Sequence, residues 1–169
     1  MPVLKIKTQV HPDFAESQGK YHDEQAIMDV ADYVLRSDKA PSQLAGGIAM
    51  NPLLAKEQFG IVAQAYGKDF GVRLRHMILS FGPNEKISLL DAKNIAYQAA
   101  AYYGGQYQIL WGCHTDGSCL HIHFVMNTVS YLTGRKYDGS KADYYGFQSH
   151  LNRVLEPYGL YLITVKDTA

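Results

Sequence analysis

The chain has 169 residues, 47% hydrophobic and 19% charged, which excludes an intrinsically disordered protein and favours one globular domain spanning residues 1–169. Sixteen Lys and Arg balance sixteen Asp and Glu, and the formal net charge of zero excludes a long polybasic tail. Two cysteines are too few for a disulfide scaffold and no apolar run is long enough to cross a bilayer, so we expect a cytoplasmic protein that does not act in a membrane.

The first third of the chain predicts a strand followed by two helices. Alternating apolar residues predict a strand over 3–7, and a polar stretch predicts a loop over 12–22. Apolar residues at helical spacing predict an amphipathic helix over 23–36. Gly46 and Gly47 indicate a loop, and Asn51-Pro52 begins a second helix that ends near Gly67.

The remainder of the chain predicts four strands and two helices. The elements expected in order are a strand over 74–81, a helix over 88–103, strands over 107–113 and 120–129 joined by a turn at 114–118, a loop over 131–140, a helix over 141–155 and a strand over 160–165. Because the two central strands form a hairpin, we predict an α+β fold with a central, mainly antiparallel five-stranded sheet flanked by helices.

The most informative segment is the histidine-rich strand. His121 and His123 are two residues apart and therefore share one face, whereas the residues between them are apolar. His114 lies across the predicted turn and supplies a third imidazole, and three neutral imidazoles bind a divalent metal ion with positions left open. Asp116 is placed to orient one of these rings by accepting its second N–H. We expect helices on one face of the sheet and these histidines on the other.

Two other interpretations of this segment stay open. An H-x-H pair alone is often a polar pair on a half-buried strand, and the third histidine is what favours a metal site. Cys113 and Cys119 flank the histidines, so a structural Cys/His zinc site is the second alternative, but the two cysteines form no C-x-x-C motif and Cys113 is predicted to face away from His114. We therefore predict that both cysteines are small core or turn residues.

The pattern H-x-D-x-x-x-x-H-x-H-x-x-x-N at 114–127 resembles the third motif of the relaxase/mobilisation nuclease family, whose members are HUH-type endonucleases. Segment 31–39 is similar to the family's first motif, 75–83 to its second motif and 133–136 to the T-G-K/R-K that follows its histidine strand. The similarity covers residues 20–160. The neutral charge is a departure, and because relaxases usually continue further we expect a short family member or an isolated catalytic domain.

The resemblance implies site- and strand-specific DNA nicking and rejoining at an origin of transfer, which initiates conjugative mobilisation. The implied nucleophile is Tyr33, which helical spacing also places well away from the apolar stripe of its helix. Its attack is expected to leave a 5′-phosphotyrosyl link and a free 3′-hydroxyl, with Asp116 acting through a histidine as base. Mg²⁺ or Mn²⁺ is the expected metal, and other transition metals stay open. Tyr21 and His22 are the alternative nucleophiles.

The implied partners are single-stranded or hairpin DNA at the transfer origin and the accessory and coupling proteins of a conjugation system. Two rival functions remain open, namely a rolling-circle replication initiator and a non-catalytic DNA-hairpin binding module with a structural metal. Tyrosines over 102–145 are expected to serve as stacking platforms for bases or as ordinary core residues. The residues expected to contact DNA are Ser80, Arg75, Arg135, Lys136 and Asn127.

Overall fold

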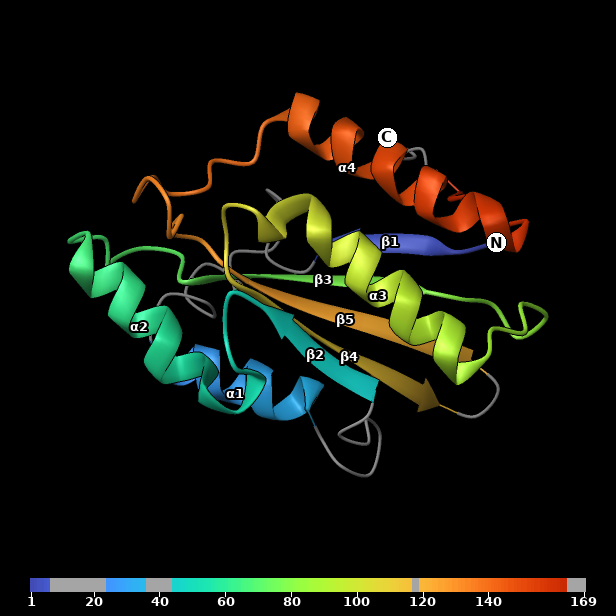
Figure 1. Cartoon of the computed structure of the whole chain (residues 1–169), viewed down its shortest axis with the longest axis horizontal. Helices are drawn as coiled ribbons and strands as arrows, with labels where there is room; N and C mark the ends of the chain where they lie inside the picture. Colours follow the sequence, from blue (N-terminus) through green and yellow to red (C-terminus); the bar gives the residue numbers. More distant parts are fainter. Residues whose placement is uncertain (7–23, 36–43, 117–118, 164–169) are drawn as a thin grey trace, which may run out of the picture.

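The computed structural model describes residues 1–6, 24–35, 44–116 and 119–163 (Figure 1). Within these residues the chain forms, in order, β1 (Val3–Ile6), α1 (Glu24–Val34), β2 (Ala45–Ile48), η3 (Pro52–Leu54), α2 (Ala55–Ala65), β3 (Leu74–Ser80), α3 (Leu89–Gly104), β4 (Ile109–Asp116), β5 (Cys119–Asn127), α4 (Lys141–Leu155) and η4 (Glu156–Tyr158).

The strands form one five-stranded sheet in the order β1-β3-β5-β4-β2, and every neighbouring pair is antiparallel. The predicted α+β fold with a central antiparallel sheet is therefore confirmed. The two edge strands are short, whereas the three interior strands, β3, β5 and β4, carry the motifs singled out in the sequence. No helix in the described part of the chain is long and apolar enough to span a membrane.

Two predicted elements at the sheet edges are wrong. Gly46 and Gly47 lie in edge strand β2, which pairs with β4, and not in a loop. A side chain at Gly46 would overlap the Trp111 indole, so a glycine is needed for this strand to pack there. The last predicted strand does not form over 160–163; instead the amide of Leu162 donates to the Asn152 side chain, and that of Ile163 to the Pro2 carbonyl.

The helix predicted from Asn51 begins as the short 3-10 helix η3 before continuing as α2. The predicted cap is present, because the Asn51 side chain accepts a hydrogen bond from the amide of Leu53 at 3.0 Å. Ser88 and Ser140 cap α3 and α4 in the same way through the amides of Asp91 and Asp143. These caps fix where the helices begin.

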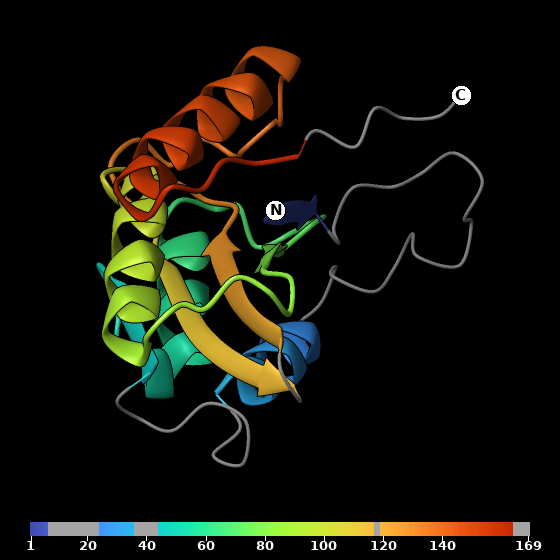
Figure 2. The same cartoon turned by 90° about the vertical axis from the view of Figure 1, so that its right-hand side faces the viewer.

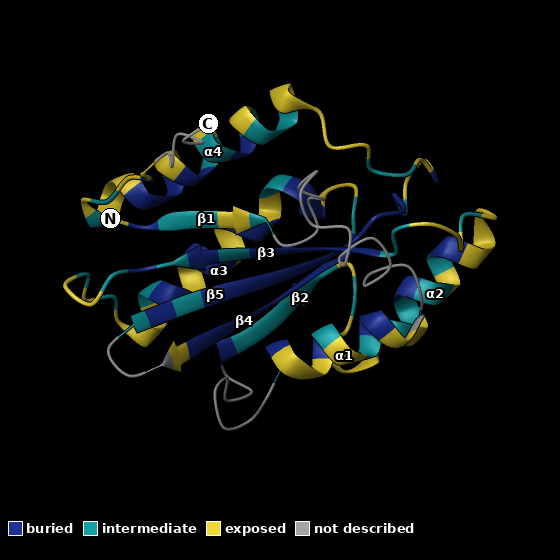
Figure 3. Ribbon diagram, turned by 180° about the vertical axis from the view of Figure 1, so that it is seen from behind, coloured by how far each residue is buried: buried dark blue, intermediate teal, exposed yellow. Residues whose placement is uncertain are grey.

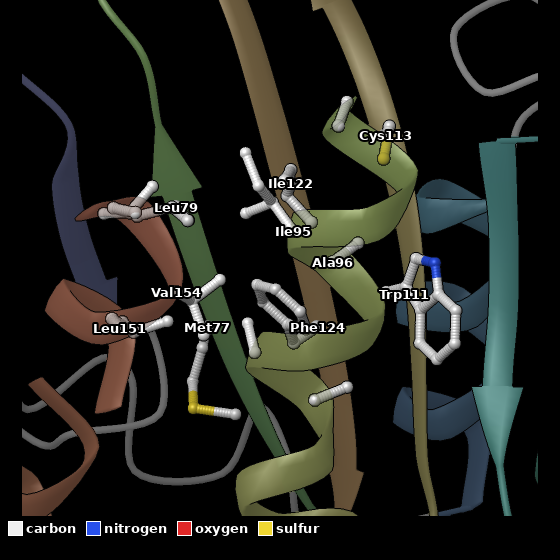
Figure 4. Packing of buried hydrophobic residues seen from close by; sticks show 14 of the residues in the cluster. Met77, Leu79, Ile95, Ala96, Trp111, Cys113, Ile122, Phe124, Leu151 and Val154 are labelled. Carbon is white, nitrogen blue, oxygen red and sulfur yellow. The ribbon is translucent and has the colours of Figure 1, made fainter. Parts of the chain in front are cut away.

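The larger core lies between the sheet and the helices α3 and α4. Figure 4 shows α3 packed across the sheet, with Ile95 and Ala96 against side chains of β5 and β4. Leu151 and Val154 of α4 extend the same core over β3. The strand residues that face these helices are Met77, Leu79, Trp111, Cys113, Ile122 and Phe124, all of them buried. The predicted core position of Cys113 is confirmed.

A second core lies on the opposite face of the sheet, where α1 and α2 pack. Ile27, Ala31 and Val34 of α1 and Phe59 of α2 cover Leu74, Leu110 and Val125 of the sheet. Figure 2 shows α1 on the side of the sheet away from α3 and α4, and Figure 3 shows α1 and α2 from that side. The expectation that helices cover only the face without the histidines is therefore wrong, because periodicity shows that a helix is amphipathic but not which face it covers.

Candidate active site on the histidine face

The three interior strands bring the histidine motifs together by their register. His114 of β4 lies directly opposite His121 of β5, and Gly112 lies opposite His123. On the other side of β5, Ser80 lies opposite His121. Paired residues project from the same face of a sheet, so these side chains share one surface. His114 is part of β4 and not of the turn, which is shorter than predicted.

Three histidine rings cluster on this surface. Nδ1 of His123 is 3.1 Å from Nε2 of His76, and the two rings are stacked with centroids 5.4 Å apart. The His114 ring centroid is 4.4 Å from that of His123. All three rings are buried. His76 was not among the predicted site residues, although its spacing from Ser80 on one strand already places both on the same face.

The C-terminal end of α1 is held against this cluster. His114 donates its Nε2–H to the backbone carbonyl of Val34 at 2.6 Å, because a carbonyl only accepts hydrogen bonds. The helix end comes this close because residue 112 is glycine: a Cβ there would lie well within 3.0 Å of the Val34 carbonyl. The missing side chain opposite His123 therefore creates the space in which α1 ends.

Tyr33 lies beside the histidines. Its ring meets His114 and His123 edge-on, with centroid separations of 5.5 Å in both cases. Its side chain is 42% exposed, whereas the neighbouring Val34 is buried, which confirms the predicted position off the apolar stripe. The rival nucleophiles Tyr21 and His22 lie outside the described residues, so the role of Tyr33 stays a prediction.

His121 has a different environment from the other two predicted ligands. Its Nδ1 is 3.0 Å from the Ser80 hydroxyl, and its ring is only partly buried. Ser80 was expected to contact DNA, and in the structure its hydroxyl holds an imidazole. Asp116 ends β4 opposite Cys119, but its side chain lies outside the part of the chain that is described.

The predicted metal ligands have the right chemistry, because neutral imidazoles bind divalent transition metals. Among the described residues, however, no three His, Cys, Asp or Glu side chains lie in an arrangement ready to hold an ion. One ring nitrogen of each predicted ligand already interacts with a protein group: Val34 for His114, Ser80 for His121 and His76 for His123. The donor set fits a metal in its chemistry, and the nitrogen that would bind the ion is the other ring nitrogen of each histidine.

Arg75, expected to contact DNA, is buried on the opposite face of the sheet. Its Nη1 donates to the Tyr103 hydroxyl at 3.0 Å and to the Tyr137 hydroxyl, and it lies 3.7 Å from Asp143 Oδ2. Its guanidinium carbon is 4.4 Å from the centroid of the Tyr137 ring. With only 4% of its surface exposed, Arg75 supports the packing of α3 and α4 against the sheet and is not placed to meet a phosphate.

The tyrosines of this network are also structural. Tyr103 and Tyr137 both donate to the Asp143 carboxylate. Burial raises the pKa of Tyr137 to about 12 and raises that of Tyr103 further, so both hydroxyls remain neutral donors at neutral pH. Tyr103 and Tyr137 are therefore core residues, the second of the two roles expected for these tyrosines.

The other predicted DNA contacts divide between buried and exposed residues. Asn127 is buried, and its amide donates to Gln108 Oε1 at 2.9 Å and to the Phe59 carbonyl at 3.3 Å, so it joins β5 to α2 and contacts no solvent. Lys136 donates to the carbonyls of Phe70 and Val72 and holds the segment that leads into β3. Arg135 is exposed and stays a candidate phosphate contact.

Comparison with known proteins decides the family. A model of the nuclease domain of MobA/VirD2-like relaxases matches residues 33–160, about three-quarters of this chain. The chain belongs to the MobA/VirD2-like relaxase family. The matched region begins at Tyr33 and contains the histidine strand, the Ser80 strand and the loop that bears Arg135 and Lys136.

Individual proteins match smaller parts of the chain. The protein "Protein rlx" of Staphylococcus aureus is 33% identical over 87 residues, which are 52% of this chain and 27% of that protein. The "Group II intron-interrupted relaxase LtrB" of Lactococcus lactis subsp. cremoris strain MG1363 is 25% identical over 115 residues, 66% of this chain and 20% of that protein. The chain therefore matches about a quarter of the length of these curated relatives.

Proposed function

We propose that this relaxase-family chain nicks one strand of DNA at an origin of transfer and later rejoins it, with Tyr33 as the nucleophile. The observation that carries the proposal is the half-exposed phenol held edge-on to two buried histidines on the sheet. The relaxase nuclease-domain model and the name of the Lactococcus relative, a relaxase, support a role in DNA mobilisation.

The proposed reaction exchanges one phosphodiester for another. The Tyr33 oxygen attacks the phosphorus, the bond from phosphorus to the 3′ oxygen breaks, and the phenolic proton is replaced by a covalent 5′-phosphotyrosyl link. The departing 3′ oxygen takes up a proton and becomes a hydroxyl. Because one phosphate ester replaces another and no bond is hydrolysed, the step requires no ATP. Attack by the 3′-hydroxyl on the phosphotyrosine restores the strand.

The proton that leaves Tyr33 requires an acceptor close by. The rings of His114 and His123 lie beside the phenol. His114 carries a hydrogen on Nε2, donated to Val34, so its lone pair is on Nδ1. A bound metal would occupy the lone pairs of both imidazoles, so the proton passes to water at the exposed phenol, and Asp116 is proposed to act as base through the histidine that it orients.

His114, His121 and His123 are the residues that would hold a divalent ion, Mg²⁺ or Mn²⁺. Such an ion, when bound, neutralises negative charge on the non-bridging phosphate oxygens in the transition state. The protein's part is to fix the imidazoles: His114 and His121 lie opposite each other on adjacent interior strands, and His123 follows on β5. Side chains on interior strands are held more precisely than side chains on loops.

The proposed substrate is single-stranded or hairpin DNA at the transfer origin, and the proposed partners are accessory and coupling proteins of a conjugation system in the cytoplasm. Exposed Arg135 is the proposed phosphate contact. Arg75 and Asn127 are not proposed as DNA contacts, because both are buried within hydrogen-bonded networks.

The decisive experiment incubates the full chain with transfer-origin oligonucleotides and Mn²⁺ and maps any covalent adduct by mass spectrometry. We expect wild type to carry one oligonucleotide on Tyr33 and Tyr33→Phe to form no adduct. Tyr97→Phe is the matched control, because Tyr97 is an exposed tyrosine on α3, on the other side of the sheet. It is expected to nick at the wild-type rate.

Each other outcome identifies a different error. An adduct on Tyr21 or His22 overturns the choice of nucleophile. Cleavage of replication-origin hairpins in preference to transfer-origin hairpins favours the rolling-circle initiator. Tight hairpin binding with no nick under Mg²⁺ or Mn²⁺ favours the non-catalytic binding module.

A further inference from the structure

The proposed nicking chemistry does not use the pairing of His76 with His123. His76 projects from β3 and His123 from β5, on the same face of the sheet. They are diagonal neighbours, because His123 lies opposite Ile78, two residues from His76 along β3. Nε2 of His76 is 3.1 Å from Nδ1 of His123. Both rings are buried, with exposed fractions of 7% and 5%.

A hydrogen bond between two imidazole nitrogens assigns them different states. One nitrogen carries the hydrogen and the other the lone pair, because two N–H groups or two lone pairs repel at this distance. The pair therefore selects a tautomer for each ring. If His123 is the donor, its Nδ1 carries the hydrogen and its Nε2 is left basic.

The other two predicted ligands show the same relationship with their surroundings. His114 is held through Nε2 by the Val34 carbonyl, and His121 is held through Nδ1 by the Ser80 hydroxyl. Histidines that bind metals commonly donate their second N–H to a neighbouring acceptor, which orients the ring and fixes its tautomer. His76 occupies this position toward His123.

We propose that His76 is a positioning residue that accepts the Nδ1–H of His123 and so keeps Nε2 of His123 as the basic nitrogen of the site. The proposal rests on the proposed function in that it gives His123 a role at the reacting phosphate. His76 itself is not proposed to contact metal or substrate. It acts only through the orientation and tautomer of its neighbour.

The first test measures the tautomer without metal or DNA. The full chain is labelled with ¹⁵N-histidine, and long-range ¹⁵N–¹H correlation spectra are recorded at pH 8, with His123→Ala used for assignment. We expect wild-type His123 to be the Nδ1–H tautomer. A wild-type His123 with hydrogen on Nε2 overturns the proposal, and this measurement needs no variant at position 76.

Variants separate the hydrogen bond from packing. His76→Gln retains an acceptor oxygen near the position of Nε2 and is expected to keep the Nδ1–H tautomer, whereas His76→Phe is expected to lose it. Ile78→Ala is the matched control. Ile78 lies opposite His123, so this substitution removes packing next to His123 without removing a hydrogen-bond acceptor. An unchanged tautomer in His76→Phe, or a change in Ile78→Ala equal to it, overturns the proposal.

The second test titrates each protein with Mn²⁺ alone by calorimetry. We expect about 10- to 100-fold weaker binding for His76→Phe, with His76→Gln restoring most of the affinity. Failure of glutamine to restore affinity, with its fold intact by circular dichroism, overturns the positioning role. Loss of the proposed function is distinguishable, because a chain that never nicks DNA can still show the predicted His123 tautomer.

Discussion

The Nε2 of His114 donates to the backbone carbonyl of Val34 across 2.6 Å, and this bond joins the end of α1 to strand β4. Val34 directly follows Tyr33, so the bond also fixes where the phenol lies relative to the histidines. The contact depends on Gly112, whose Cα faces the same carbonyl.

Replacing Gly112 with alanine is therefore expected to impair both stability and nicking. The added Cβ would overlap the Val34 carbonyl, so α1 has to shift outward and carry Tyr33 with it. We expect a loss of about 1–3 kcal/mol in the free energy of unfolding and a larger loss of adduct formation. Urea unfolding and the oligonucleotide adduct assay measure the two effects.

Gly60→Ala is the control for this substitution. Gly60 lies in α2, and a Cβ there meets no atom within 4 Å. Alanine is expected to stabilise this helix by about 1 kcal/mol and to leave nicking unchanged. Wild-type nicking by Gly112→Ala would show that the approach of α1 to β4 does not position the nucleophile.

Ser80→Ala is expected to slow nicking without weakening DNA binding. The Ser80 hydroxyl is 3.0 Å from Nδ1 of His121, so its loss frees that ring to turn. We expect about a tenfold lower nicking rate and an unchanged affinity for the oligonucleotide by fluorescence anisotropy. A weaker affinity with a normal rate at saturation would instead place Ser80 in contact with DNA.

Arg75 and Arg135 are expected to behave differently when each is removed. Arg75→Met leaves Asp143 without its buried cation and is expected to cost about 3 kcal/mol of stability, with little change in the salt dependence of DNA binding. Arg135→Ala is expected to leave stability unchanged and to lower the slope of log K against log salt by about 1. Equal changes in salt slope would contradict the buried role of Arg75.

Stability is expected to fall in alkaline solution. Burial raises the pKa of Tyr137 from its usual 10.0 to about 12 and that of the Cys113 thiol from 9.0 to about 12. Between pH 9 and 12 the unfolded chain therefore holds fewer protons than the folded chain, and the free energy of unfolding decreases as pH rises. Below pH 9 these two groups contribute no slope.

Urea unfolding at pH 8, 9.5 and 11 measures this loss. Tyr137→Phe is expected to flatten the decline above pH 10, because the substituted ring has no proton to lose. A Tyr137→Phe protein whose stability falls as steeply as wild type would show that the alkaline transition belongs to other groups.

Local sequence patterns predicted most of the fold because they report which side of each element is apolar. The stripe on α1 placed Tyr33 off the core, and the alternation along β5 placed His121 and His123 on one face; the structure agrees with both. The predicted cap at Asn51 was equally local, since its side chain bonds an amide two residues away.

Features that depend on distant contacts were not visible in the sequence. Strand β2 contains two glycines and has low strand propensity, and it forms because it pairs with β4 beside Trp111. The burial of Arg75 follows from acceptors on α3 and α4 that are far away in the chain. His76 was overlooked for the same reason, since only the register of β3 against β5 brings it to His123.

The sheet order has a consequence for how a DNA strand is admitted and released. β5 lies in the middle of the sheet and is hydrogen-bonded to β3 on one side and β4 on the other. The strand that carries His121 and His123 therefore cannot shift without breaking backbone hydrogen bonds to both neighbours. Tyr33 lies on α1, whose C-terminal end is held at β4 through the hydrogen bond from His114 to the Val34 carbonyl. Any movement during a catalytic cycle is therefore expected in α1, which carries the nucleophile, while β5 keeps its histidines in place.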